Sequence, residues 1–171
     1  FLVSRLPART AAEAATMVAK VVGYERDPQP ADAWCRRAVG IASDEGTPPD
    51  YERAELLRDD LLAFGFSDVA RIYQSLGGTT AQIVQAAQAG ASLINYLGHG
   101  TPTGWTSVDF TSTDVRALAN GRQLPWIVDV SCSTGDFSRP ECFAEAWLRA
   151  GSVAKPAGAV GMVAASTATP W

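Results

Sequence analysis

Short apolar runs alternate along the chain with stretches whose apolar residues recur at the period of a helix. Continuous apolar runs between turn residues are typical of strands that are buried on both faces of a parallel sheet. The sequence predicts such strands at 38–42, 68–76, 92–98, 125–132 and 158–166, after a first strand and loop at 1–10.

Helical spacing predicts helices between these strands, at 12–25, 51–65, 81–90, 113–121 and 142–151. The same spacing places several apolar residues on inner faces: Ala14, Met17, Val18 and Val21 in the first helix, and Leu56, Leu57, Leu61 and Phe64 in the second. Capping residues indicate where some of these helices begin and end. They are Thr79 or Thr80 and Thr113 or Asp114 at two helix starts, and Gly65, Gly90 and Gly121 at three helix ends.

The repeated strand–helix order predicts one α/β domain over residues 1–171, with a mostly parallel sheet and helices on both faces. A hydrophobic content of 47% suits a single core of this size. In open sheets of this kind, sites form beyond the carboxyl ends of the strands. Three segments reach that edge with polar or reactive residues: ASDEG at 42–46, LGHG at 97–100 and DVSCSTGD at 129–136.

Charge and hydropathy exclude two classes of partner. The net charge is −4 and no basic cluster occurs, which argues against a nucleic-acid partner. No apolar stretch reaches the roughly 18 to 20 residues of a membrane helix, so we expect no membrane insertion. No signal peptide is visible, and the chain opens on a strand-like segment and stops just after an apolar run. We therefore expect it to be an excised portion of a longer protein.

The one histidine and one of the three cysteines follow successive predicted strands. The interval from His99 to Cys132 is long enough for one crossover helix, so both residues reach the same sheet edge if their strands are neighbours. A thiol and an imidazole in contact are the ingredients of nucleophilic catalysis. Gly98 and Gly100 allow close backbone approach, and the N–H groups of Gly100 and Cys132 are candidates for an oxyanion hole. Spacing alone does not separate this interpretation from a buried structural thiol and a structural imidazole.

Four stretches resemble the gingipain family of cysteine peptidases, which has a caspase-like fold. They are NYLGHG at 95–100, QLPWIVDVSCSTGDF at 123–137, PECFAEAWLRA with KPAGAVGMVAAST at 140–167, and WCRRAVGIASDEG at 34–46. The resemblance implies that Cys132 is the nucleophile, that His99 is the general base and acid, and that Glu45 orients the imidazole. Asp44, which is adjacent and chemically equivalent, is the alternative to Glu45.

The resemblance is looser for substrate-binding residues. It makes Asp50 the candidate to receive a basic P1 side chain, although Asp50 is equally well explained as a helix N-cap. Leu97, Val130 and Trp171 match positions in the wall of the family's substrate pocket. Leu97 stands where arginine-cleaving members have a small hydroxyl residue, which predicts a more apolar or narrower wall.

The resemblance implies a cysteine endopeptidase that acts on polypeptides at the surface of a bacterium or outside it. It requires no cofactor, and it allows a structural calcium ion for which the sequence indicates no ligand set. Zinc is disfavoured because the chain has no C-x-x-C pair and a single histidine. Two alternatives stay open: a sortase-like peptidase that processes secreted proteins, and a non-catalytic caspase-like binding module.

Overall fold

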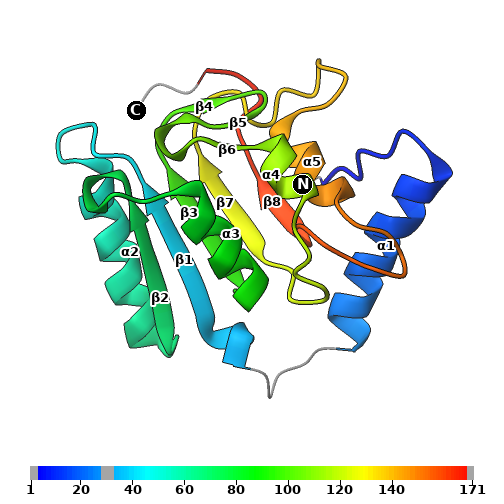
Figure 1. Cartoon of the computed structure of the whole chain (residues 1–171), viewed down its shortest axis with the longest axis horizontal. Coiled ribbons are helices and arrows are strands. Elements are labelled where there is room, and N and C mark those ends of the chain that lie inside the picture. Colours follow the sequence, from blue (N-terminus) through cyan, green and yellow to red (C-terminus); the bar gives the residue numbers. More distant parts are fainter. Residues whose placement is uncertain (1–3, 28–32, 169–171) are drawn as a thin grey trace.

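The computed structural model describes residues 4–27 and 33–168, and in this part of the chain five parallel strands form one sheet (Figure 1). The spatial order is β2-β1-β3-β7-β8. The strands are β1 (Arg37–Ala42), β2 (Asp68–Tyr73), β3 (Leu93–Leu97), β7 (Trp126–Val130) and β8 (Gly161–Val163). All five coincide with predicted strands. The strand predicted at the start is absent from residues 4–10, and residues 1–3 lie outside the described part.

Helices cover both faces of the sheet, as predicted. They are α1 (Ala11–Arg26), α2 (Asp50–Phe64), α3 (Thr80–Ala89), α4 (Ser112–Arg116) and α5 (Phe143–Arg149), with short 3-10 turns at Ala33–Arg36, Gln74–Leu76 and Thr106–Val108. The chain runs from β1 outward to β2 and then reverses through β3, β7 and β8. Because crossovers are right-handed, the reversal puts α2 on one face and α3 to α5 on the other.

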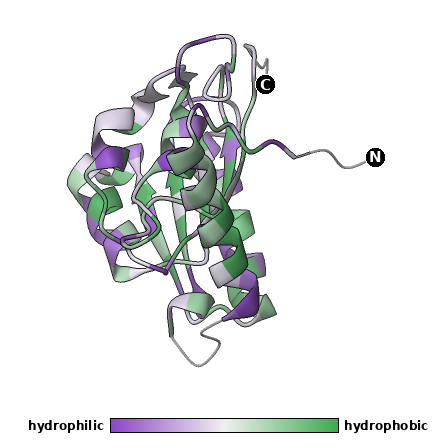
Figure 2. Cartoon of the chain, turned by 90° about the vertical axis from the view of Figure 1, so that its right-hand side faces the viewer, coloured by the Kyte–Doolittle hydropathy of each residue, from purple (hydrophilic) through white to green (hydrophobic). Residues whose placement is uncertain are grey.

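Two separate apolar clusters correspond to the two faces. Under α2, Ala54 packs with Ala42 and Tyr73. On the other face, residues of α3, α4 and α5 bury the larger cluster with β-strand side chains such as Ile41 and Ile94. Figure 2 shows hydrophobic residues both in the strands and along the helices.

Several details of the predicted helices are wrong. Leu56 and Phe64 are 69% and 85% exposed, because α2 meets the sheet through the small Ala54. In α1, Val18 is 48% exposed, and Thr16, Met17 and Lys20 are buried instead. The fourth helix begins after Thr111, which forms a capping box with Asp114, and its C-cap is Ala117 rather than Gly121. Thr79 caps α3, and Gly65 and Gly90 end their helices as predicted.

A small antiparallel sheet, which the sequence pattern did not indicate, follows β3 directly. It consists of β4 (Gly100–Thr101), β5 (Gly104–Trp105) and β6 (Phe110–Thr111). Trp105 anchors it to the core, since its ring stacks on Tyr96 with centroids 4.6 Å apart and also contacts Phe143 and Trp147. The segment after His99 is therefore a rigid hairpin seated on the core.

Candidate active site

The carboxyl ends of β1, β3 and β7 lie side by side at one edge of the sheet (Figure 1). The last residues of these strands are in register, with Ala42 opposite Leu97 and Leu97 opposite Val130. The loops that carry the three polar segments therefore leave from adjacent positions. The chain also reverses direction across the sheet between β1 and β3, which is where open α/β sheets place their sites.

Glu45 contacts His99 across this edge. The distance from Glu45 Oε2 to His99 Nε2 is 2.7 Å, and the two side chains are 58% and 49% exposed. The loop before α2 is compact, because the Asp50 N–H donates to the Glu45 carbonyl at 2.8 Å and the Tyr51 N–H donates to the Ser43 carbonyl. The backbone N–H of Asp44 donates to Gln74 Oε1 at 3.4 Å. Of the two candidate carboxylates, Glu45 is the one against the imidazole.

The backbone of His99 is held by the hairpin that follows it. Its carbonyl accepts from the Tyr96 hydroxyl at 2.6 Å and from the Thr106 N–H at 2.9 Å. Its N–H donates to Ser107 Oγ at 3.2 Å. A Cβ on Gly98 would lie 2.9 Å from both the Tyr96 hydroxyl and Ser107 Oγ, so this packing requires glycine. The imidazole therefore projects from a backbone with little freedom to move.

The loop that carries Cys132 packs against the same hairpin. Cys132 is half-buried, and the next residue, Ser133, has a left-handed φ of 60°. The N–H of Ser133 donates to the carbonyl of Thr167 at 3.0 Å, which braces the loop on the segment after β8. A Cβ on Gly100 would lie 2.7 Å from the Cys132 carbonyl oxygen. The backbones beside His99 and beside Cys132 are thus in direct contact, as expected for neighbouring strands.

A buried carboxylate beneath the two loops was not anticipated from the sequence. Asp129 lies on β7, is 5% exposed, and accepts from Trp105 Nε1 at 2.9 Å and from Ser131 Oγ at 2.5 Å. Burial raises the pKa of Asp129, against the opposing effect of these hydrogen bonds. The feature of the sequence that could have indicated a role for Asp129 is its charge within the otherwise apolar strand WIVDV.

The predicted substrate-binding residues have different surroundings. Asp50 is buried, its Oδ2 accepts from Ser43 Oγ at 2.5 Å, and it is the first residue of α2. Because Pro49 occupies the N-cap position, the interpretation of Asp50 as an N-cap is wrong. Leu97 and Val130 are paired, so their side chains share one face of the sheet, and Val130 is 39% exposed. Trp171 lies outside the described residues.

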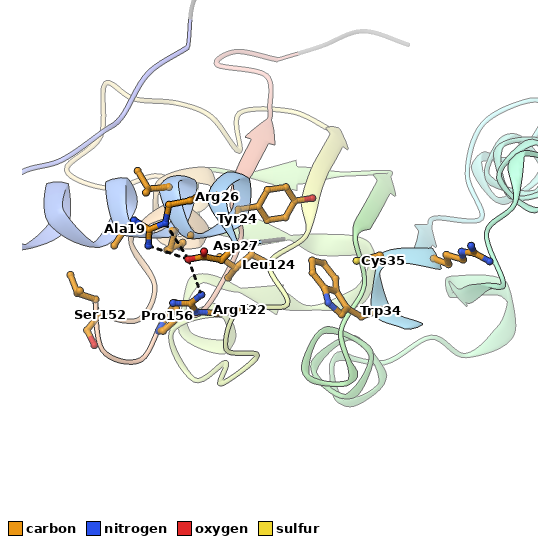
Figure 3. Close-up of a pocket in the computed structure, with 15 residues that line it drawn as sticks. Ala19, Tyr24, Arg26, Asp27, Trp34, Cys35, Arg122, Leu124, Ser152 and Pro156 are labelled. Carbon is orange, nitrogen blue, oxygen red and sulfur yellow. Dashed lines mark hydrogen bonds and ion pairs between the residues drawn. The ribbon is translucent and has the colours of Figure 1, made fainter. Parts of the chain in front are cut away.

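A cavity of about 450 Å³ lies away from this edge (Figure 3). It is lined by one side of α1, by Trp34 and Cys35 before β1, and by Leu124 before β7, and therefore sits at the amino ends of the strands. Arg26 and Arg122 flank it and both pair with Asp27. This cavity shares no residue with the Glu45, His99 and Cys132 site.

Two features are absent from residues 4–27 and 33–168. In this part of the chain, no group of three or more His, Cys, Asp or Glu side chains is arranged to hold a metal ion. No helix in the same residues has the length and apolar character needed to cross a membrane.

Comparison with known proteins decides the family. The model of Peptidase family C25 matches residues 1–170. The chain belongs to peptidase family C25. It is 37% identical over 164 residues to gingipain R2 of Porphyromonas gingivalis, a match that covers 91% of this chain and 22% of the relative. It is 24% identical over 173 residues to Lys-gingipain HG66 of the same bacterium, covering 98% and 10% of the two chains.

The structural comparison gives the same result for this C25 family chain. The crystal structure of the Arg-specific cysteine proteinase gingipain R superposes with a TM-score of 0.92 at 34% sequence identity, covering 96% of this chain and 39% of that chain. The predicted gingipain-type family and caspase-like fold are both confirmed. The chain spans about a fifth of the length of gingipain R2.

Proposed function

We propose that this chain forms the catalytic region of a cysteine endopeptidase. The observation that carries the proposal is the 2.7 Å contact between Glu45 and His99, on a hairpin whose Gly100 packs against the backbone of Cys132. Membership of a peptidase family supports it. The same geometry argues against a non-catalytic binding module, because a half-exposed carboxylate–imidazole pair beside a half-buried thiol serves no packing purpose.

In the proposed reaction, Cys132 supplies the nucleophile. Glu45 accepts from the Nε2–H of His99, which leaves Nδ1 unprotonated and able to take the proton of the Cys132 thiol. The Cys132 sulfur attacks the scissile carbonyl carbon and forms a tetrahedral oxyanion, toward which the N–H groups of Gly100 and Cys132 donate. As the C–N bond breaks, the imidazolium gives its proton to the leaving amine.

The second half of the reaction releases the acyl group. His99 removes a proton from water, and the resulting hydroxide attacks the thioester carbonyl. Collapse of the second tetrahedral intermediate breaks the C–S bond, and the sulfur leaves as a thiolate that the imidazolium protonates. The carboxylic acid product departs, and Cys132 and His99 regain their starting states. Glu45 stabilises the imidazolium that forms in both halves.

The proposed substrates are polypeptides, with the residue before the cut lying near Leu97 and Val130. Asp50 is the proposed acceptor for a basic P1 side chain, and Ser43 Oγ holds its carboxylate by donating to Oδ2. The structurally similar gingipain R is an Arg-specific cysteine proteinase, which supports a basic preference. We further propose an extracellular or cell-surface location in a bacterium, consistent with the bacterial source of the relatives.

The test of this proposal is peptide cleavage by the full-length protein and its Cys132→Ala variant. The substrates are a mixed peptide pool, and mass spectrometry identifies each cut. We expect the parent to cut the pool and Cys132→Ala to lose at least about a thousandfold in rate, as for loss of a nucleophile. Cys35→Ala is the matched control, because Cys35 lies at the opposite edge of the sheet beside the cavity. Retention of most activity by a folded Cys132→Ala protein would exclude the proposed nucleophile.

A further inference from the structure

Asp129 connects the two halves of the candidate site from below. One carboxylate oxygen accepts from Trp105 Nε1, and the other accepts from Ser131 Oγ. Trp105 belongs to β5, and its partner across the small sheet is Gly100, the residue after His99. Ser131 is the residue before Cys132. A single side chain therefore contacts the hairpin that follows the imidazole and the loop that carries the thiol.

The main sheet does not set the relative position of these two segments by itself. The ladder between β3 and β7 ends at the pair Leu97 and Val130, and both His99 and Cys132 lie two residues beyond it. One further backbone bond, from the Gly98 N–H to the Val130 carbonyl at 3.3 Å, crosses between the strands. Past that point, hydrogen bonds to the Asp129 side chain connect the hairpin to the loop.

The chemistry of the three groups suits a rigid connection. An indole N–H only donates, and an ionised carboxylate only accepts, so the bond to Trp105 has a single possible polarity. Trp105 and Ser131 are each 1% exposed and Asp129 is 5% exposed, which excludes competing water. Hydrogen bonds to a charged group are stronger than neutral ones, and a buried partner left without its bond is costly. Both donors are therefore held in one geometry.

We infer that Asp129 is a positioning residue, which holds the His99 hairpin and the Cys132 loop at the separation that thiol–imidazole chemistry needs. The inference rests on the proposed function for its catalytic meaning. In this role Asp129 does not contact the substrate, because its carboxylate is buried beneath the site. The bridge consists of the Trp105 donor on the hairpin side and of the Ser131 and Thr134 hydroxyls on the loop side. Removing either side should release the two loops from each other.

This requirement gives a double-mutant test in the full-length protein. Trp105→Phe removes the indole donor but keeps an aromatic ring. A loop variant, Ser131→Ala with Thr134→Val, removes the hydroxyl donors on the other side. We expect each variant to lose roughly 10- to 100-fold in kcat at little changed KM, since a misplacement of about 1 Å has effects of this size. The variant that combines the Trp105 change with the loop changes should be no slower than the slower of the two, because the loss of either side already breaks the bridge. Additive losses would show independent packing effects and overturn the inference.

A second readout does not depend on peptide cleavage. The rate of Cys132 alkylation by iodoacetamide, followed by mass spectrometry across a pH series, reports how readily the thiolate forms beside His99. We expect the alkylation profiles of Trp105→Phe and of the loop variant to differ from the parent's, with slower alkylation at neutral pH. If the parent cleaves no peptides, the proposed function fails while this profile still tests the bridge. A profile identical to the parent's in both folded variants would refute the positioning role.

Trp147→Phe is the matched control. Trp147 lies in the same aromatic cluster as Trp105, is fully buried, and its Nε1 has no hydrogen-bond partner. Loss of indole volume is then similar in the two variants, and only Trp105→Phe removes a bond to Asp129. The melting temperature should fall further in Trp105→Phe, which leaves a buried carboxylate oxygen without its donor, and kcat and the alkylation profile should change only in that variant. Equal losses of kcat in the two variants would assign Trp105 to packing alone.

Discussion

Replacing Gly100 with alanine tests the contact that brings the candidate nucleophile and imidazole together. An added Cβ would meet the Cys132 carbonyl oxygen at 2.7 Å and Thr134 Cγ2 at 2.8 Å, and it would also collide with Ser131 Oγ. An ordinary contact is about 3.4 Å or more, so the hairpin and the nucleophile loop must separate by roughly 0.7 Å. The Cys132 carbonyl belongs to the backbone, and the Ser131 and Thr134 side chains are buried, so little room is left for a local adjustment.

A separation of this size acts on catalysis more than on folding. Displacements near 1 Å are associated with losses of about 100-fold, so we expect kcat/KM to fall by roughly one to two orders of magnitude. Overpacking of this kind lowers stability by about 1 to 3 kcal/mol. The assay is peptide hydrolysis under pseudo-first-order conditions, with urea unfolding to confirm that the variant is folded.

Gly23→Ala is the control for this experiment. Gly23 lies in α1, where an added Cβ has no neighbour closer than 3.9 Å, and alanine favours a helix by up to about 1 kcal/mol. This variant should keep full activity and equal or greater stability. If Gly100→Ala also keeps parental kcat/KM, then the close contact with Cys132 has no catalytic importance and the reasoning about the site is wrong.

Two further predictions concern charged groups. Glu45→Gln keeps the shape of the pair but removes the negative charge of Glu45. We expect kcat to fall roughly 3- to 30-fold, less than for Cys132→Ala, because both side chains of the pair are half-exposed. The control Asp44→Asn should match the parent, and equal rates in the two variants would count against an orienting role for Glu45. Lys20 donates to four carbonyls around the end of α5, and burial lowers its pKa to about 7. The unfolded chain, with a lysine pKa near 10.4, then binds more protons between these values, so stability rises with pH there by at most about 1.4 kcal/mol per unit. Urea unfolding at pH 7, 8 and 9 should show this slope in the parent and a flatter one in Lys20→Met; parallel slopes would contradict it.

The sequence predicted the strands better than the contacts of the helices. Each strand of the main sheet is a continuous apolar run, and a run of that kind is readable without knowledge of its neighbours. The buried face of α2 was misjudged because Leu56 and Phe64 fit a helical stripe, whereas the sheet accepts the small Ala54 at that place. Helical period indicates which residues share a face, but the neighbouring element determines which face is covered.

Within the site, residue types and strand ends were enough to select His99, Cys132 and the acidic loop as candidates. The choice between Glu45 and Asp44 required the structure, because adjacent carboxylates in a loop are distinguished only by where the loop turns. The role of Asp129 could not be anticipated either. Its partners include Trp105, 24 residues before it, and Ser131, 2 residues after it, and these two meet only when the hairpin folds onto the core.

The order of elements and the reactive side chains at strand ends were therefore determined by the sequence alone. Local patterns decide them, since apolar runs, capping residues and glycines act over a few neighbouring positions. The contact between Glu45 and His99, the approach of Gly100 to Cys132 and the bridge through Asp129 were decided only by the tertiary structure. These depend on sheet order and on the seating of the small antiparallel sheet, which are set by packing between distant segments.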